Sequence, residues 1–93
     1  MGESTNDLKE KISIAAYFLA KENHPYDTLC WMLAERQLFI QFNFRRPQED
    51  LIRHKAAEIF FSNPNYDVLC WLIAEKNILI KDKKSERNSK HTF

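Results

Sequence analysis

The chain has 93 residues, of which 44% are hydrophobic and 29% charged, and its formal net charge at neutral pH is +1. A chain of this length forms one domain, near the lower end of what folds alone. One Gly and three Pro disfavour a sheet-rich fold with many tight turns, and a charge near zero by itself predicts neither nucleic-acid nor membrane binding.

The sequence contains no segment typical of membrane insertion or secretion. No stretch approaches the roughly 18 consecutive apolar residues of a membrane span. The N-terminal sequence MGESTNDLKEK lacks the basic start and apolar core of a secretory signal, and the residues after Gly2 do not fit the myristoylation pattern. We therefore expect a cytoplasmic protein without a membrane partner.

Two helices are predicted in the first half of the chain. The first spans roughly residues 6–22, because Ile12, Ala16 and Leu19 fall at helical spacing. Asn23-His24-Pro25 ends this helix, since the residue before a proline disfavours the helical conformation. The second helix opens at about Pro25 and is apolar on nearly all sides, which predicts that other helices or another chain cover it.

Two further helices are predicted in the second half. Pro47 marks the start of the third helix, and Ser62-Asn63-Pro64-Asn65 breaks it. The fourth helix resembles the second, and its strong apolar periodicity stops at Ile80. Residues 83–93 have almost no apolar side chains to bury, so we expect a disordered basic tail.

The second and fourth helices carry an internal repeat. Residues 26–40, YDTLCWMLAERQLFI, recur forty positions later as YDVLCWLIAEKNILI, with eight of the fifteen positions identical. Such similarity at a fixed period indicates one supersecondary unit used twice. We therefore predict an all-α four-helix domain over residues 1–82, made of two tandem helix-turn-helix hairpins, about 6–42 and 47–81, with approximate two-fold symmetry.

Each hairpin resembles a bacterial family of short proteins known only as a domain of unknown function. The family pattern is an alanine-rich helix, a polar loop and a helix with Trp-x-x-Ala-Glu. The matching residues here are Ala15, Ala16, Trp31, Ala34 and Glu35 in the first copy and Ala56, Ala57, Trp71, Ala74 and Glu75 in the second. The resemblance implies a helical hairpin and no particular activity.

The two cysteines, Cys30 and Cys70, are candidates for metal binding or redox chemistry. Neither lies in a Cys-x-x-Cys motif, and the three histidines show no zinc-site spacing. Both cysteines fall on the apolar face of their helix, where a free thiol behaves as a small hydrophobic group. We expect two buried, reduced cysteines and no metal or cofactor.

Glu35 and Glu75 form the other candidate pair, for metal binding or acid–base chemistry. Helical bundles that use such carboxylates usually carry a Glu-x-x-His motif, which is missing here. A structural ion pair with Arg45, Arg46 or a lysine on a neighbouring helix is the favoured interpretation. With no catalytic group to name, we expect a protein that is not an enzyme.

Excess apolar surface on the second and fourth helices favours a protein–protein interaction module, either a homodimer or a small adaptor. The predicted interaction surface is Met32, Phe39, Phe42, Leu72 and Leu79. The predicted core of the repeats is Leu29, Cys30, Trp31, Leu69, Cys70 and Trp71. The alternative is a small nucleic-acid-associated regulator that uses a helix and the basic tail, with contacts from Arg45, Arg46, Arg53, Lys55, Lys83, Lys84 and Arg87.

Overall fold

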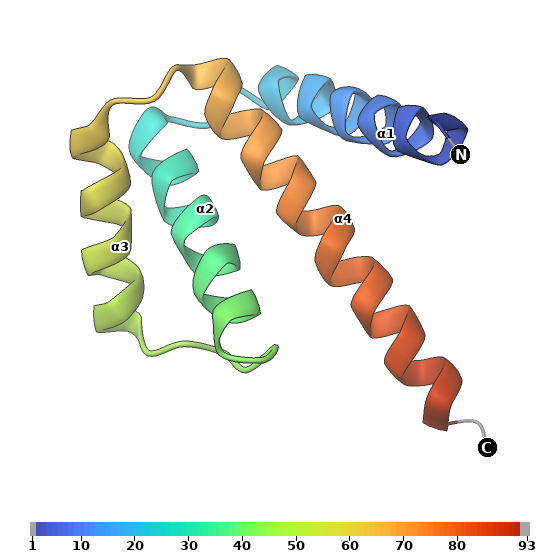
Figure 1. Cartoon of the computed structure of the whole chain (residues 1–93). Helices are drawn as coiled ribbons and strands as arrows, with labels where there is room; N and C mark the ends of the chain where they lie inside the picture. The colour runs from blue at the N-terminus through green and yellow to red at the C-terminus, as the bar shows by residue number, and fades with distance from the viewer. Residues whose placement is uncertain (1, 92–93) are drawn as a thin grey trace.

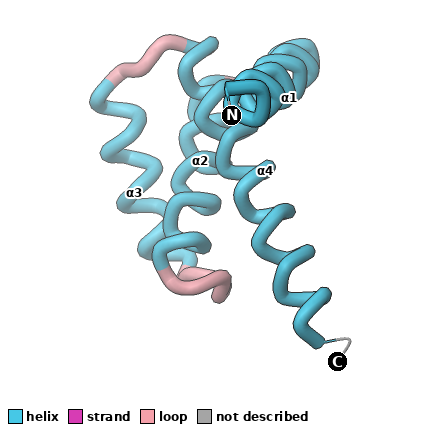
Figure 2. Tube along the Cα trace, turned by 45° about the vertical axis from the view of Figure 1, so that its right-hand side comes forward, coloured by secondary structure: helices cyan, strands magenta, loops and turns pink. Residues whose placement is uncertain are grey.

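The computed structural model describes the backbone of residues 2–91 and the side chains of residues 7–83. It contains four helices and, within residues 2–91, no strand (Figures 1 and 2). They are α1 (Gly2–Lys21), α2 (Tyr26–Gln41), α3 (Glu49–Ser62) and α4 (Tyr66–His91). The predicted all-α class is confirmed.

The loops after α1 and α3 end their helices in the same way. Asn23 and Asn63 both adopt the left-handed conformation, each with φ of 58°, which asparagine tolerates better than most residues. The N–H of Asn63 donates to the carbonyl oxygen of Phe60 at 3.1 Å and so satisfies one of the last carbonyls of α3. A proline follows within two residues in both loops, so neither helix can continue.

The helices pack in an order that differs from a pair of closed hairpins. α2 lies between α3 and α4, and α1 packs against α4 near the start of α4, with its N-terminal end pointing away (Figure 1). Within residues 2–91, α1 makes no close backbone contact with α2, and α3 makes none with α4. The two helix-turn-helix units are therefore open, because the loops at Asn23 and Asn63 direct each following helix away from the one before it.

Two tyrosine hydroxyls connect these loops to each other. Tyr26, the first residue of α2, donates to the carbonyl oxygen of Pro64 at 2.5 Å. Tyr66, the first residue of α4, donates to the carbonyl oxygen of His24 at 2.7 Å. Each helix start is thereby attached to the loop that precedes the other helix, which holds the N-terminal ends of α2 and α4 together.

The core lies mainly between α2 and α4, with α3 covering one side. Leu29 and Leu69 have no exposed surface, and Cys30 and Cys70 are also buried, as predicted. The remaining buried members of this cluster are Leu33, Ala34, Leu38, Ile52, Ile59 and Ile73. α2 is apolar on nearly all sides because it contacts two helices at once.

α4 extends beyond the body of the molecule (Figure 1). Its 26 residues correspond to about 39 Å at 1.5 Å per residue. The radius of gyration is 14.4 Å, whereas a compact chain of this length has about 12 Å. The predicted boundary at residue 82 does not coincide with a helix end, because the backbone of α4 stays helical to His91. Residues 92–93 of the predicted tail lie outside the described residues.

Candidate functional site

The predicted interaction surface on α2 and α4 is divided by the structure. Phe42 and Leu79 are exposed, as an interaction surface requires. Met32 and Leu72 pack against the core instead, and the ring of Phe39 is partly buried beside that of Phe44, with centroids 5.5 Å apart. Most of these apolar side chains are therefore covered by the chain itself, since α2 and α4 pack on each other.

The tryptophans predicted as core residues lie at the edge of the core. Trp31 and Trp71 are both partly exposed. Trp31 packs against the core cluster and lines a groove between α2 and α3. Trp71 lines a shallow hollow with Lys9, Glu10 and Ser13 of α1. Both indoles are thus only partly covered by the protein.

The most exposed of the large hydrophobic side chains belong to α1 and α3 rather than to α2 and α4. Phe61 near the end of α3 is 82% exposed, and Phe60 beside it is also exposed. Tyr17 and Phe18 near the end of α1 are 58% and 60% exposed. The apolar spacing of α3 places Ile52 and Ile59 on its buried face, and Phe61 falls off that face. The sequence signal for this surface is an aromatic residue that lies outside the apolar stripe of its helix.

The exposed aromatic residues of α3 border an apolar groove of about 290 Å³ between α2 and α3. We call it the α2–α3 groove. It is lined by Asp27, Cys30, Trp31, Arg53, Ala56, Ala57, Phe60 and Phe61. The ring of Phe60 packs edge-on against Tyr26 on one side, at 5.5 Å, and against Phe61 on the other, at 5.6 Å. The charges on its rim come from Asp27 and from Arg53, which contacts Asp50 at 3.2 Å.

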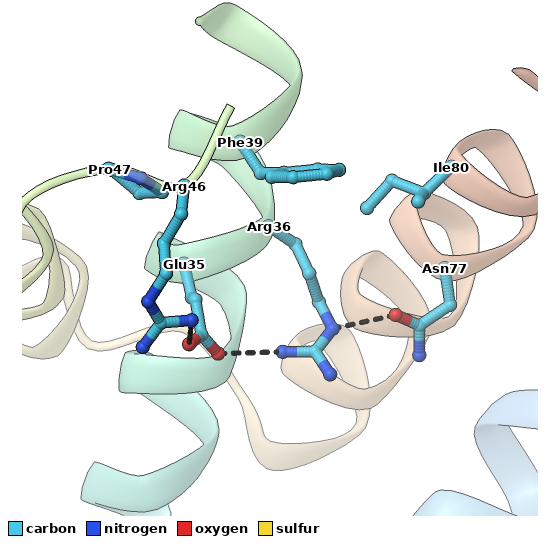
Figure 3. Close-up of a pocket in the computed structure, with 7 residues that line it drawn as sticks. All are labelled: Glu35, Arg36, Phe39, Arg46, Pro47, Asn77 and Ile80. Atoms are coloured by element: carbon cyan, nitrogen blue, oxygen red, sulfur yellow. Dashed lines mark hydrogen bonds and ion pairs between the residues drawn. The ribbon is translucent and has the colours of Figure 1, made fainter. Parts of the chain in front are cut away.

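A second hollow, of about 250 Å³, lies where α2, α4 and the loop before α3 meet (Figure 3). The Glu35 carboxylate is 3.3 Å from the guanidinium of Arg36 and 3.5 Å from that of Arg46. Arg36 also donates to the side-chain oxygen of Asn77 at 2.6 Å and to the carbonyl oxygen of Met32 at 3.0 Å. Figure 3 shows the four polar side chains connected to one another. The arrangement is typical of an ion-pair network that joins helices.

Glu75, the counterpart of Glu35 on α4, is paired with its neighbour Lys76 at 3.5 Å. Both carboxylates therefore have cationic partners. Glu35 has the predicted partner Arg46, whereas the partner of Glu75 lies on its own helix and not on a neighbouring one. Among the described residues, no group of three His, Cys, Asp or Glu side chains is placed to hold a metal ion.

Cys30 and Cys70 are free thiols in the core. Burial raises the pKa of both thiols above the ordinary 9.0, and the negative charges of Asp27 and Asp67 raise these pKa values further. Burial likewise raises the pKa of Tyr26 and Tyr66, with a smaller contribution from the neighbouring cysteines. A thiol with a raised pKa is a poor nucleophile at neutral pH, because the thiolate is the reactive form.

Three of the seven basic residues of the alternative interpretation are paired with carboxylates. Arg46, Arg53 and Lys55 contact Glu35, Asp50 and Glu58 at 3.5, 3.2 and 3.6 Å. Arg45 and Lys83 are exposed. Lys84 and Arg87 lie on the described backbone of α4, but their side chains are outside the described part. Among the described side chains, Arg46, Arg53 and Lys55 each lie beside a carboxylate, which weakens a continuous basic surface for phosphate contacts.

Fold and surface together define a small all-α domain with an apolar groove between two of its helices. Comparisons with protein-family models, with curated proteins and with solved structures give no match. None of the helices, over the residues described, has the length and apolar character needed to cross a membrane.

Proposed function

We propose that the chain is a non-enzymatic protein–protein interaction module whose binding surface is the α2–α3 groove. The exposure of Phe61, 82% of its surface at the edge of an apolar groove, carries this proposal. Aromatic residues and arginine are enriched at protein interfaces, and truncating them often costs most of the binding energy. The groove combines Trp31, Phe60 and Phe61 with Arg53 at its rim.

The binding surface on α2 and α4 predicted from sequence is a weaker candidate, because Met32 and Leu72 pack on the core. The nucleic-acid alternative has less support, since Arg46, Arg53 and Lys55 have carboxylate partners. We retain the cytoplasm as the proposed compartment.

We also propose that the chain is a tandem repeat with approximate two-fold symmetry. The hydrogen bonds of Tyr26 and Tyr66 support this. Tyr66 lies forty positions after Tyr26, and its acceptor His24 lies forty positions before Pro64, the acceptor of Tyr26, so each bond is the counterpart of the other. The helix pairs support it as well. In the repeat α1 corresponds to α3 and α4 corresponds to α2, and both α1 with α4 and α3 with α2 are in contact. Membership of the bacterial hairpin family remains a proposal that rests on the sequence motif.

Site-specific photocrosslinking tests the proposed binding surface. A photoreactive phenylalanine analogue at position 61 replaces a ring that is mostly exposed, and the same analogue at Phe42 is a matched control on another exposed surface. We expect protein adducts from position 61 and few from position 42, both with purified protein and in an extract of the cells that make it. If position 61 yields no adduct in either setting, the groove is not a binding surface and the proposal is wrong.

A further inference from the structure

Three residues of α3 lie on one face of the helix, each one turn from the next. Arg53, Ala57 and Phe61 are spaced by four residues, so their side chains form a continuous row. The row borders the α2–α3 groove, to which all three residues contribute. The Arg53 side chain is 65% exposed, and Phe61 is exposed further.

This row is self-complementary. A two-fold axis at Ala57 that pairs α3 with an antiparallel copy of itself places Phe61 of each chain opposite Arg53 of the other. An arginine over an aromatic ring is attracted by the negative face of the ring. The small side chain of Ala57 at the crossing point permits the two backbones to approach closely.

We propose that a second copy of this chain occupies the groove surface, with the two α3 helices antiparallel and crossing at Ala57. This inference rests on the proposed function and names the partner. The exposed cation and the exposed ring at the two ends of the row support it, because the antiparallel pairing would bring the guanidinium of Arg53 to the ring of Phe61 at both ends. Asp50 lies 3.2 Å from the same guanidinium and compensates its charge inside the interface.

The corresponding row on α1 shows why α3 is the helix that pairs. Forty positions earlier the three residues are Ser13, Tyr17 and Lys21. A bulky Tyr17 stands where α3 has Ala57, and the Lys21 ammonium lies 5.3 Å from the centre of the Tyr17 ring. The cation–aromatic contact of α1 is therefore made within one helix, and its middle residue prevents a close crossing.

The surface available on α3 predicts a weak dimer. A phenylalanine offers roughly 200 Å², so two Phe61 rings at 82% exposure remove on the order of 300 Å² from water. Stable specific interfaces bury about 1,200–2,000 Å² in total. A single helix pair with its rims falls near or below the lower limit, so the dimer should form at about 100 μM and dissociate near 1 μM.

A charge exchange across the proposed axis tests the pairing. Phe61→Lys places an ammonium opposite Arg53 of the second copy, and we expect the dissociation constant from sedimentation equilibrium to rise at least about tenfold. Arg53→Glu removes the cation and should also weaken the dimer. Combining the two substitutions places a carboxylate at position 53 opposite an ammonium at position 61 of the other copy. This double variant should return the constant to within about threefold of the original. Thermal melts confirm that each variant folds.

A disulfide test reports the axis directly. Ala57→Cys puts two thiols at the crossing point, so mild oxidation should give a covalent dimer, whereas Ser13→Cys on the matching row of α1, which is exposed and leaves Tyr17 in place, should not. The native cysteines do not interfere because both are buried. If the chain dimerises but Ala57→Cys does not crosslink and the double variant is not restored, α3 is not the interface. A strict monomer at about 100 μM whose position 61 crosslinks another protein overturns the second copy as partner and leaves the proposed function standing.

Discussion

The most direct test of the fold is a pair of matched core substitutions, Leu29→Ala and Leu69→Ala. Both leucines have 0% of their surface exposed, one in α2 and one in α4. Replacing a buried leucine by alanine removes its transfer free energy and leaves a cavity, at a cost of about 2–5 kcal/mol. Complete burial against several helices limits relaxation, so we expect a loss of about 3–4 kcal/mol at each position.

This loss is large for such a small domain. At roughly 0.05–0.15 kcal/mol per residue, 93 residues give a free energy of unfolding of about 5–14 kcal/mol. Urea melts at about 1 μM, where self-association is negligible, should show a lower midpoint with an unchanged slope. Phe61→Ala is the control, because an exposed ring contributes within about 0.5 kcal/mol. A loss below about 1 kcal/mol at either leucine would show that the core is not packed as described.

Other predictions concern the thiols, the edge of the core and the end of the chain. Cys30 and Cys70 should react slowly with iodoacetamide in the folded protein and quickly in urea; fast labelling without urea would contradict their burial. Burial raises the pKa of both thiols above 9.0, so above about pH 9 the folded chain holds protons that the unfolded chain has released. The two thiols should not affect the free energy of unfolding below that pH, and this free energy should fall as pH rises through the raised pKa values. Urea melts at about pH 8 and about pH 10 would measure the difference. Trp31→Ala should cost about 1–3 kcal/mol, less than a fully buried aromatic residue, because its ring is partly exposed; a cost above that range would place the indole in the core. Deleting residues 84–93 should leave the melting temperature nearly unchanged, and a drop of more than about 5 °C would show that this segment stabilises the body.

The sequence predicted the helices and much of the core because both follow from local spacing. Apolar periodicity places Leu29 and Cys30 on the buried face of their helix, and both are buried. The partner of each helix could not be predicted in the same way, because it depends on the direction in which the chain leaves Asn23 and Asn63. Phe61 shows the limit for the candidate site: its spacing excludes it from the buried face of α3, but the groove beside it exists only once α2 has packed there.

The packing of α1 against α4 has a consequence for how the protein forms during synthesis. Ile12 is buried, and α4 is the one helix that α1 contacts within residues 2–91. α1 therefore leaves the ribosome well before its partner and keeps its apolar face in water until α4 has emerged. Contacts between such distant parts of the chain slow folding, because a long loop must close before they form. Neither helix-turn-helix unit brings its own two helices into contact, so we expect the domain to fold as one cooperative unit only after α4 has been synthesised.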